Sequence, residues 1–566
     1  MSTTELSARL PEKKRLNIAE IATSTDHKVI GLLTLGTALV FFAIFGGFAL
    51  TMRADLASPA QQLISTHLYN ELFTLHGSGM IYLVITPIAL GLGIYLVPLL
   101  IGAPGLALPR TAQLAYYCLL GSGFVMLSGF LTWGGAADTG WYSYMPLSTS
   151  LYSPGKGVDL WIGAVFLAAL SGLLYSVSII WTVVRMRAPR MSMLRMPIFV
   201  WSEVVTAMMG LAAFPALIGA MVLQTLGRVD PAYFTHDLPN LDYQNLFWFY
   251  GHPVVYIMFF PFVGCVAEVI QTFGQRRYVG YKPTVLSLLL FAAMSMSVWG
   301  HHMFTTGQES NEYFSATSTA LSVPAGLEYF GFLATLIGAK LRFKTPLLFA
   351  LAFIPQFLVG GLSGIMLAAP TLDYQFHGSY FVVAHFHYTL FAGSVFGFFA
   401  GFYYWFPKAT GRMLSERLGK THFWLLTIGT NVTFGPMFAA GFLGMSRRVA
   451  HYPSDLHTLN VVETLGSAVI GLSMLFLVVN VGQALLHGPP APADPWDGHT
   501  LEWATTSPPP LFNFPKGLPP IKSFAPLLDW KQSLRARRAT EKPTEPVASR
   551  PAVLGSGARP EPEAGT

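Results

Sequence analysis

Apolar runs long enough to cross a lipid bilayer recur about twelve times along this chain of 566 residues. Only 11% of the residues are charged, against about 25% in soluble domains, and 52% are hydrophobic. The sequence therefore predicts an all-α polytopic membrane protein with about twelve transmembrane helices. The expected spans are 29–51, 71–101, 113–133, 159–187, 196–227, 243–272, 282–305, 311–341, 346–369, 377–406, 419–443 and 461–487.

Basic residues in the short loops set the expected orientation, because Lys and Arg collect on the cytoplasmic side of membrane proteins. With the N-terminus inside, fifteen basic loop residues face the cytoplasm and five face outward. Both termini are thus predicted to be cytoplasmic, and the net charge of +6 requires no nucleic-acid partner. The inner set is Arg110, Arg185, Arg187, Arg190, Arg195, Arg276, Arg277, Lys282, Lys340, Arg342, Lys344, Lys408, Arg412, Arg417 and Lys420, and the outer set is Arg53, Lys156, Arg228, Arg447 and Arg448.

Composition divides the chain into three parts. Residues 1–28 form a polar, basic lead-in, 29–487 form one membrane domain, and 488–566 form a Pro-rich cytoplasmic tail. The last 35 or so residues of the tail are expected to be disordered. The first 26 or so residues lack the apolar core and cleavage site of a signal peptide. Cys118 and Cys265 lie far apart in apolar segments, so any thiolate-bound metal must come from another chain.

His385 and His387 carry the strongest chemical signal, because they lie one residue apart inside an apolar segment. Helical residues two apart point about 200° apart, so one helix would hold an imidazole on each side of itself. Histidines within a membrane are costly to bury and functional by default, and neutral imidazole is a common ligand of iron and copper. A helix with a ligand on each face is typical of a wall between two metal centres.

Four further histidines lie in membrane segments. A single one is as often hydrogen-bonded to a carbonyl as bound to metal, but six together favour metal ligation. Adjacent His301 and His302 would diverge by about 100° on a regular helix, so they share one metal only near a distorted helix end. Tyr256 follows His252 by four residues, which predicts that its phenol lies beside the imidazole, although a bond to a carbonyl is the alternative. The four are His76, His252, His301 and His302.

The order of these motifs resembles subunit I of the heme–copper oxygen reductase family, in particular the cytochrome c oxidases, over nearly the whole chain. The resemblance implies twelve helices that enclose two hemes and one copper. It implies the catalytic subunit of a terminal respiratory oxidase, which reduces O2 to water with electrons relayed through a low-spin heme. It rests on Ser24-Thr25-Asp26-His27-Lys28, Thr74-Leu75-His76-Gly77 with Met80, Leu246-Phe247-Trp248-Phe249-Tyr250-Gly251-His252-Pro253, Trp299-Gly300-His301-His302-Met303-Phe304, the His385/His387 segment, Gly444-Met445-Ser446-Arg447-Arg448, and Leu501-Glu502-Trp503 ahead of Ser507-Pro508-Pro509-Pro510.

The resemblance implies a role for each metal ligand. His76 and His387 would be the axial ligands of the low-spin heme, and His385 would be the single protein ligand of the high-spin heme. Tyr256 would be covalently joined to the first copper histidine and would donate an electron and a proton to O–O cleavage. The copper would be held by His252, His301 and His302.

The resemblance also places residues around the hemes. Arg447 and Arg448 would pair with heme propionates through charge-assisted bonds. Trp248 would stack nearby, and Asp373 and His377 would lie above the hemes, close to the propionates.

Two details concern the cofactors. Arg53 resembles the arginine that touches the formyl group of a low-spin heme, which favours heme A, although an interfacial arginine that snorkels is the alternative. The resemblance also suggests a magnesium ion at His377, against which Gly378 argues, because relatives carry aspartate there.

Residues that relatives use for proton uptake are mostly missing. Val254 replaces the usual glutamate two residues after the first copper histidine, Gly105 replaces the usual acid at the mouth of the same path, and Ala112 replaces an asparagine. The tyrosine–serine pair that substitutes in some relatives is also missing from residues 256–262. These replacements argue against proton pumping.

A second proton path survives in altered form. Glu328 stands where relatives carry a lysine, and Ala325 replaces a threonine. A buried glutamate shuttles protons if burial raises its pKa. Glu328 is thus the candidate proton input, and a structural acid bonded to a neighbouring helix is the alternative.

Three other functions compete with a cytochrome c oxidase. A nitric oxide reductase-like enzyme would not need Tyr256, and a transporter or channel would not need this many ligands. A quinol oxidase is disfavoured because Leu68 and Glu71 stand where quinol-oxidising relatives carry His and Gln. The expected partners are a subunit II with a dinuclear copper site, a subunit III, cytochrome c, O2 and the lipid bilayer. The expected location is a bacterial inner membrane.

Overall fold

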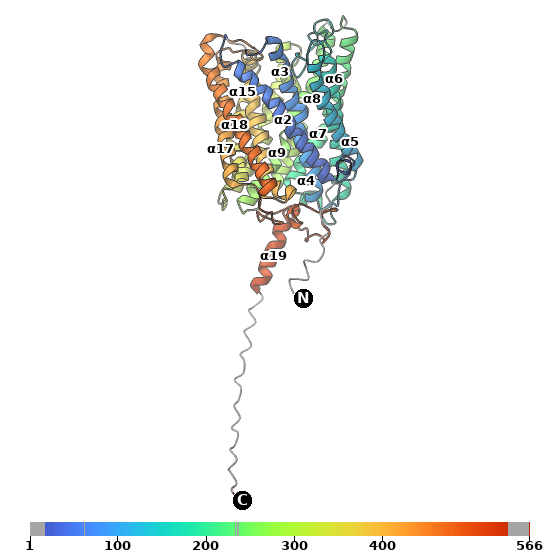
Figure 1. Cartoon of the computed structure of the whole chain (residues 1–566), viewed down its shortest axis with the longest axis vertical. Helices are drawn as coiled ribbons and strands as arrows, with labels where there is room; N and C mark the ends of the chain where they lie inside the picture. The colour runs from blue at the N-terminus through green and yellow to red at the C-terminus, as the bar shows by residue number, and fades with distance from the viewer. Residues whose placement is uncertain (1–16, 61–62, 233, 235–236, 541–564, 566) are drawn as a thin grey trace.

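A computed structural model of the chain describes residues 17–60, 63–232, 234, 237–540 and 565. Within these residues there is no β-strand, and eleven helical segments are long and apolar enough to cross a membrane. Figure 1 shows them side by side in one bundle, with α19 projecting from one end. The prediction of an all-α polytopic membrane protein is confirmed.

The first half of the bundle contains several crossings that are built from more than one helical segment. Its elements are α1 (Ile18–Ala22), α2 (His27–Asp55), α3 (Thr66–Ser78), η2 (Gly79–Ile85), α4 (Thr86–Leu100), α5 (Pro109–Ser128), η3 (Gly129–Leu131), α6 (Gly157–Met186), η4 (Met193–Arg195), α7 (Ile198–Val229), α8 (Asp237–Ile257) and α9 (Phe260–Phe273).

The second half of the chain completes the bundle and adds the tail. Its elements are α10 (Tyr281–Ser295), η6 (Trp299–Thr306), α11 (Asn311–Ala320), α12 (Ser322–Leu336), α13 (Thr345–Leu367), α14 (Pro370–Phe376), α15 (Tyr380–Phe386), η7 (His387–Val395), α16 (Phe396–Thr410), α17 (Glu416–Phe442), η8 (Ser454–Leu456), α18 (His457–His487), η9 (Leu501–Ala504) and α19 (Pro526–Thr540).

The expected span at 311–341 differs from the others, because it consists of two helices of 10 and 15 residues, α11 and α12. Pro324 explains the interruption. A proline ring clashes with the carbonyl four residues earlier, which here belongs to Ala320, the last residue of α11. The described part of the chain thus has eleven long crossings where the sequence predicted about twelve, and the remaining one is divided.

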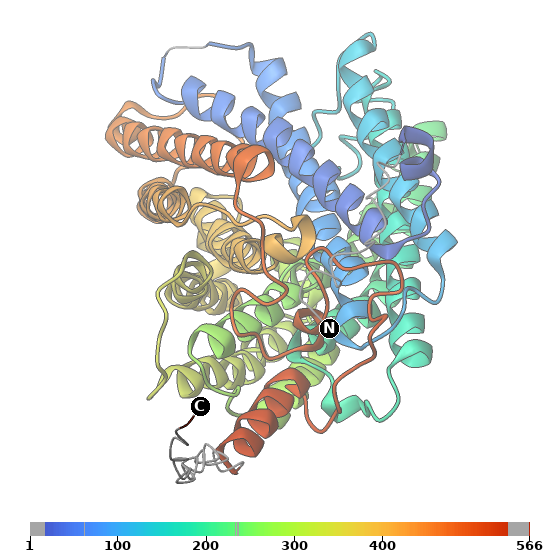
Figure 2. The same ribbon diagram turned by 60° about the horizontal axis from the view of Figure 1, so that its bottom comes forward.

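The tail packs against one end of the bundle over much of its length. Figure 2 shows the segment between α18 and α19 winding across that end. Basic side chains in the last turn of α16 and in the loop after it hold the tail by donating to its backbone carbonyls: Lys408 Nζ to Thr505 at 2.8 Å and Arg412 Nη1 to Gly488 at 2.8 Å. Disorder was expected for about the last 35 residues. The first of these belong to α19, and residues 541–564 and 566 lie outside the described residues.

Candidate functional site

A single cavity of about 1480 Å³ brings together nearly all the residues that the sequence singled out. Its volume exceeds the roughly 300–1,000 Å³ of ordinary small-molecule pockets, so it has room for more than one large cofactor. Glu328 does not line it, although Ala325 and Tyr329 of the same helix do. The predicted residues on its wall are Arg53, His76, Trp248, His252, Tyr256, His301, His302, Asp373, His377, His385, His387, Arg447 and Arg448.

Three of the histidines point their ring nitrogens at one spot. His302 Nε2 lies 3.2 Å from His252 Nδ1 and 3.2 Å from His301 Nε2, and one nitrogen from each ring lies within 4.8 Å of the others. Nitrogens about 2.0 Å from a shared ion lie roughly 3.2–3.5 Å apart, so the spacing fits a bound metal. His301 and His302 belong to η6, a 3-10 helix. The predicted distortion of the helix at this pair is therefore present.

The phenol of Tyr256 lies beside this trio. Its ring centroid is 4.8 Å from that of His252, as the four-residue spacing predicts. His252 Nε2 is buried and has no hydrogen-bond partner in the part of the chain that the structure describes. On the other side of the trio, the Trp248 indole stacks on His302 at a centroid distance of 4.0 Å. The trio is thus enclosed by two aromatic side chains.

Three further histidines each form a hydrogen bond from Nδ1 to a backbone carbonyl. Backbone carbonyls accept from Nδ1 of His76 (Phe45, 2.9 Å), His385 (Gly360, 3.0 Å) and His387 (Val383, 2.8 Å). Because a carbonyl only accepts, each Nδ1 carries the proton and each Nε2 keeps its lone pair. Metal-binding histidines are oriented in this way, by a hydrogen bond from the nitrogen that does not bind.

Neighbouring residues that the sequence did not single out hold these rings in place. Gly364 admits His385, because a Cβ there would lie 2.9 Å from its Cε1 atom. Phe434 stacks on His387 with the centroids 4.2 Å apart. Glycine and phenylalanine are common in membrane helices, so nothing in their spacing distinguished these two.

Two π-helical segments accompany the histidines on the cavity wall. The first, η2, begins three residues after His76, and the second, η7, begins at His387. Such segments are rare and occur frequently at functional sites. A π-helix widens the turn, so it changes the direction in which neighbouring side chains point. The widened turn of η7 follows His387, so it affects the residues after the histidine pair.

One rim of the cavity carries two half-buried cations, Arg447 and Arg448. Arg448 lies over the Tyr142 ring, 4.4 Å from its centroid. Burial lowers the pKa of Arg448 to about 10 and also lowers that of Arg447. Neither Nε has a hydrogen-bond partner among the described residues, so an anionic group in the cavity would compensate both cations. Nearby, His377 Nδ1 lies 3.0 Å from an oxygen of Asp373.

Arg53 has a partner that the sequence did not reveal. Its guanidinium forms an ion pair with Glu463 at 3.0 Å and donates to the Asn460 carbonyl at 2.8 Å. The Glu463 side chain is fully buried. Since the two residues are 410 positions apart, no local pattern links them. Arg53 lines the cavity, and its charge is compensated by Glu463.

The comparisons with known proteins agree on one family. Residues 29–469 match the family model described as cytochrome c and quinol oxidase polypeptide I. The chain is 43% identical over 539 residues to a putative cytochrome c oxidase subunit 1-beta of Streptomyces coelicolor, covering 93% of this chain and 94% of that protein. It is 44% identical over 548 residues to a probable cytochrome c oxidase subunit 1-beta of Nocardia farcinica, covering 96% and 92%.

A solved structure shares the fold. It is described as a heme–copper terminal oxidase dimer, and it aligns with a TM-score of 0.67 at 17% sequence identity. The alignment covers 82% of this chain and 84% of the other. At this identity the likeness concerns the arrangement of the helices alone.

Proposed function

The chain belongs to the cytochrome c and quinol oxidase polypeptide I family and is a subunit I of the heme–copper oxidase type, and we propose that it reduces O2 to water with electrons from cytochrome c. The observation that carries the proposal is the cavity, which the six predicted histidine ligands and Tyr256 line together. The relatives named above are described as cytochrome c oxidase subunits, which supports the donor.

The histidines divide into three ligand sets. His76 and His387 hold the low-spin heme, and His385 holds the high-spin heme. The copper set is His252, His301 and His302. When bound, the hemes carry electrons one at a time, and the high-spin heme and copper together supply the place where O2 is reduced. Two observations support the assignment of these histidines to the hemes and the copper. Nδ1 of His76, His385 and His387 is protonated, which leaves Nε2 free to bind iron, and the nitrogens of the copper set converge on one point.

Tyr256 has the central role among the groups of the chain itself. Its phenol is held next to His252 at a centroid distance of 4.8 Å and donates an electron and a proton to O–O cleavage. The partnerless Nε2 of His252 is the atom available for a covalent bond to the phenol ring. That bond would replace an imidazole N–H and a ring C–H, and the two electrons and two protons released would pass to O2. This need for a phenol also favours O2 over nitric oxide as the substrate.

Residues at the outer rim of the cavity bind the propionate groups of the hemes. Arg447 and Arg448 pair with propionates, since both are half-buried cations whose buried Nε atoms lack partners in the described part of the chain. Asp373 and His377 lie at the same rim, and Trp248 packs between the copper set and the outside. Arg53 contacts the low-spin heme, whose type we propose to be A. The proposal also places a magnesium ion at His377, where Gly378 offers no side-chain ligand.

Electrons and protons enter from opposite sides. The described cysteines, Cys118 and Cys265, are buried and separate, so a dinuclear copper site belongs to a subunit II, and a subunit III completes the complex. The chain crosses a bacterial inner membrane with both ends in the cytoplasm. Glu328, which is buried and has one oxygen without a partner in the described residues, supplies protons from inside. With Val254 and Gly105 in place of acids, the enzyme separates charge without pumping.

Purification of the complete complex tests the proposal. We expect two heme signals in the optical spectrum, one copper per chain beyond that of subunit II, and rapid O2 uptake with reduced cytochrome c. Uptake with a quinol but not with cytochrome c would move the assignment to the quinol oxidases. Nitric oxide consumption without O2 uptake would reject the assignment.

A further inference from the structure

Three buried carboxyl groups lie on the tail side of the bundle, outside the cavity. They belong to Glu502 in the tail, Glu268 on α9 and Glu203 on α7, and each residue is 0% exposed. A carboxyl group buried without full hydrogen bonding costs free energy that an apolar side chain would not. Three such groups in one region therefore suggest a task that an apolar core cannot perform.

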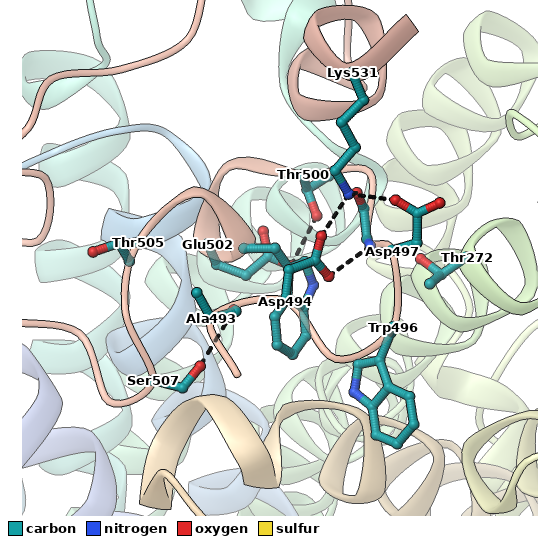
Figure 3. A network of polar contacts seen from close by, with 12 residues as sticks. Thr272, Ala493, Asp494, Trp496, Asp497, Thr500, Glu502, Thr505, Ser507 and Lys531 are labelled. Atoms are coloured by element: carbon teal, nitrogen blue, oxygen red, sulfur yellow. Dashed lines mark hydrogen bonds and ion pairs between the residues drawn. The ribbon is translucent and has the colours of Figure 1, made fainter. Parts of the chain in front are cut away.

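Glu502 connects this group to the cytoplasmic surface. Its Oε1 accepts from Trp405 Nε1 at 3.1 Å and from Thr500 Oγ1 at 2.8 Å, while Oε2 has no partner among the described residues. Burial raises the pKa of Glu502 to about 7. Figure 3 shows Glu502 and Asp494 within one network of polar contacts, in which Lys531 Nζ approaches Asp494 Oδ2 to 2.5 Å at the tail surface. Asp494 retains 18% side-chain exposure, so it contacts both water and the interior of the tail.

Glu268 is the next carboxyl group inward. Its Oε1 accepts from the Phe199 backbone N–H at 3.4 Å, and its Oε2 accepts from the Gln271 amide. The Phe199 ring packs against Trp405, with the centroids 5.3 Å apart, and Trp405 in turn donates to Glu502. The two carboxyl groups are close enough for their charges to interact.

Glu203 lies one helical turn beyond Phe199. Neither of its carboxyl oxygens has a hydrogen-bond partner in the described part of the chain. Its side chain reaches the backbone of α4, because a Cβ added to Gly93 would lie 2.5 Å from Oε2. The side chain of Cys265, which is fully buried, lies near both Glu203 and Glu268. Thr206, a turn further along α7, is another buried side chain without a partner within the described residues.

We propose that Glu502, Glu268 and Glu203 form a proton relay from the cytoplasmic end of the bundle towards the cavity, with Glu203 as the internal proton-holding group. This deepens the proposed function and rests on it, since O2 reduction consumes protons. In each step one carboxyl O–H bond breaks and another forms, and the negative charge moves the opposite way. Cytoplasmic water restores the proton at Glu502, and no oxidant or reductant takes part.

Water molecules complete the relay between the carboxyl groups. Buried water makes about three hydrogen bonds, to polar atoms that lack partners within the protein. Such atoms occur at each stage: Oε2 of Glu502, Oε1 of Gln271 and both oxygens of Glu203 have no partner among the described residues. The charged or titratable groups that face the relay are Asp494, Lys408, Tyr404, Tyr278, Tyr281 and Cys265.

The test is the Glu203→Gln variant of the complete complex, beside Glu268→Gln and Glu502→Gln. Glutamine keeps the size but cannot carry a proton, so we expect O2 uptake to fall about 10- to 100-fold with unchanged heme spectra. Glu203→Asp restores part of the rate. Infrared difference spectra between acidic and alkaline samples lose a carboxyl band in Glu203→Gln, a change that a purely structural role would not produce together with slow turnover.

Glu71→Gln is the matched control. Glu71 is also buried, at the opposite end of the bundle on α3, and accepts from the Ala136 N–H at 2.8 Å, which glutamine also does. It should keep the wild-type rate. A wild-type rate in Glu203→Gln overturns the relay, and if that variant fails to assemble, a wild-type rate in Glu502→Gln does so instead. A wild-type complex without O2 uptake would refute the proposed function rather than the relay alone.

Discussion

The histidines of the cavity and the acids beneath it are both polar clusters in an apolar bundle, but the fold treats them differently. Nδ1 of His76, His385 and His387 is fixed by a backbone carbonyl, so each ring has one orientation. Glu203 has no such partner within the described residues. Histidine rings that are held in one orientation are suited to binding a metal cofactor that stays in place. A carboxyl group without a fixed partner suits a proton, which arrives and leaves.

Removing one copper ligand should have the largest effect. In His302→Ala the trio loses the nitrogen that lies 3.2 Å from both others. We expect the copper of this chain to be lost and O2 uptake to fall by more than about 100-fold, since even the loss of a supporting hydrogen bond costs about 10- to 100-fold in affinity or activity. Metal analysis and an oxygen electrode measure both. His422→Ala, a buried histidine of α17 outside the cavity, should keep its copper.

The Tyr256→Phe variant tests whether the phenol takes part in O2 reduction without being needed for heme or copper binding. It keeps the ring beside His252 but removes the phenolic proton. We expect normal heme spectra and copper content, with O2 uptake reduced about 100-fold or more. Full uptake in this variant would contradict the role of the phenol.

Glu328→Gln compares the two proton inputs. Glu328 lies on α12 and Glu203 on α7, so the routes are separate. If both deliver protons, each single variant retains the rate that the other route supports, and the double variant is slower than either. Because Glu203→Gln is expected to retain only about 1 to 10% of the rate, the Glu328 route carries the minor share. We therefore expect Glu328→Gln alone to change O2 uptake little, and the double variant to be several-fold slower than Glu203→Gln. A double variant no slower than Glu203→Gln alone would show that Glu328 is structural.

The tail should show the smallest effect on activity. Burial lowers the pKa of His499 to about 4, below its ordinary 6.5. The neutral form therefore stabilises the docked tail above pH 6.5, and this contribution is lost as the pH falls towards 4, by up to about 3 kcal/mol. Glu502, with a raised pKa, acts in the opposite direction, so the variant must be compared with the wild type. Hydrogen exchange should show the tail of His499→Phe gaining protection relative to wild type as the pH falls.

The sequence revealed the features that depend on local spacing. The long apolar runs predicted the crossings, adjacent His301 and His302 predicted a distorted helix, and the four-residue interval predicted the contact of Tyr256 with His252. These inferences succeeded because neighbours on a helix have fixed relative directions.

Features that depend on distant segments could not be predicted. The Arg53–Glu463 pair joins α2 to α18, and Glu203 is one acid in an apolar run whose surroundings come from α4 and α9. The packing of the tail against the bundle could not be predicted for another reason. Its Pro-rich composition favours an extended chain, yet Trp496 and Trp503 bury their rings against the bundle.

Oxygen uptake by the purified complex in proteoliposomes, with reduced cytochrome c outside and the external pH recorded, tests the central claim most directly. We expect rapid uptake without external acidification, because electrons enter from outside, protons enter from inside and none are pumped. External acidification would contradict it by showing that protons are pumped. Absence of uptake despite intact heme spectra would contradict the proposed oxidase itself.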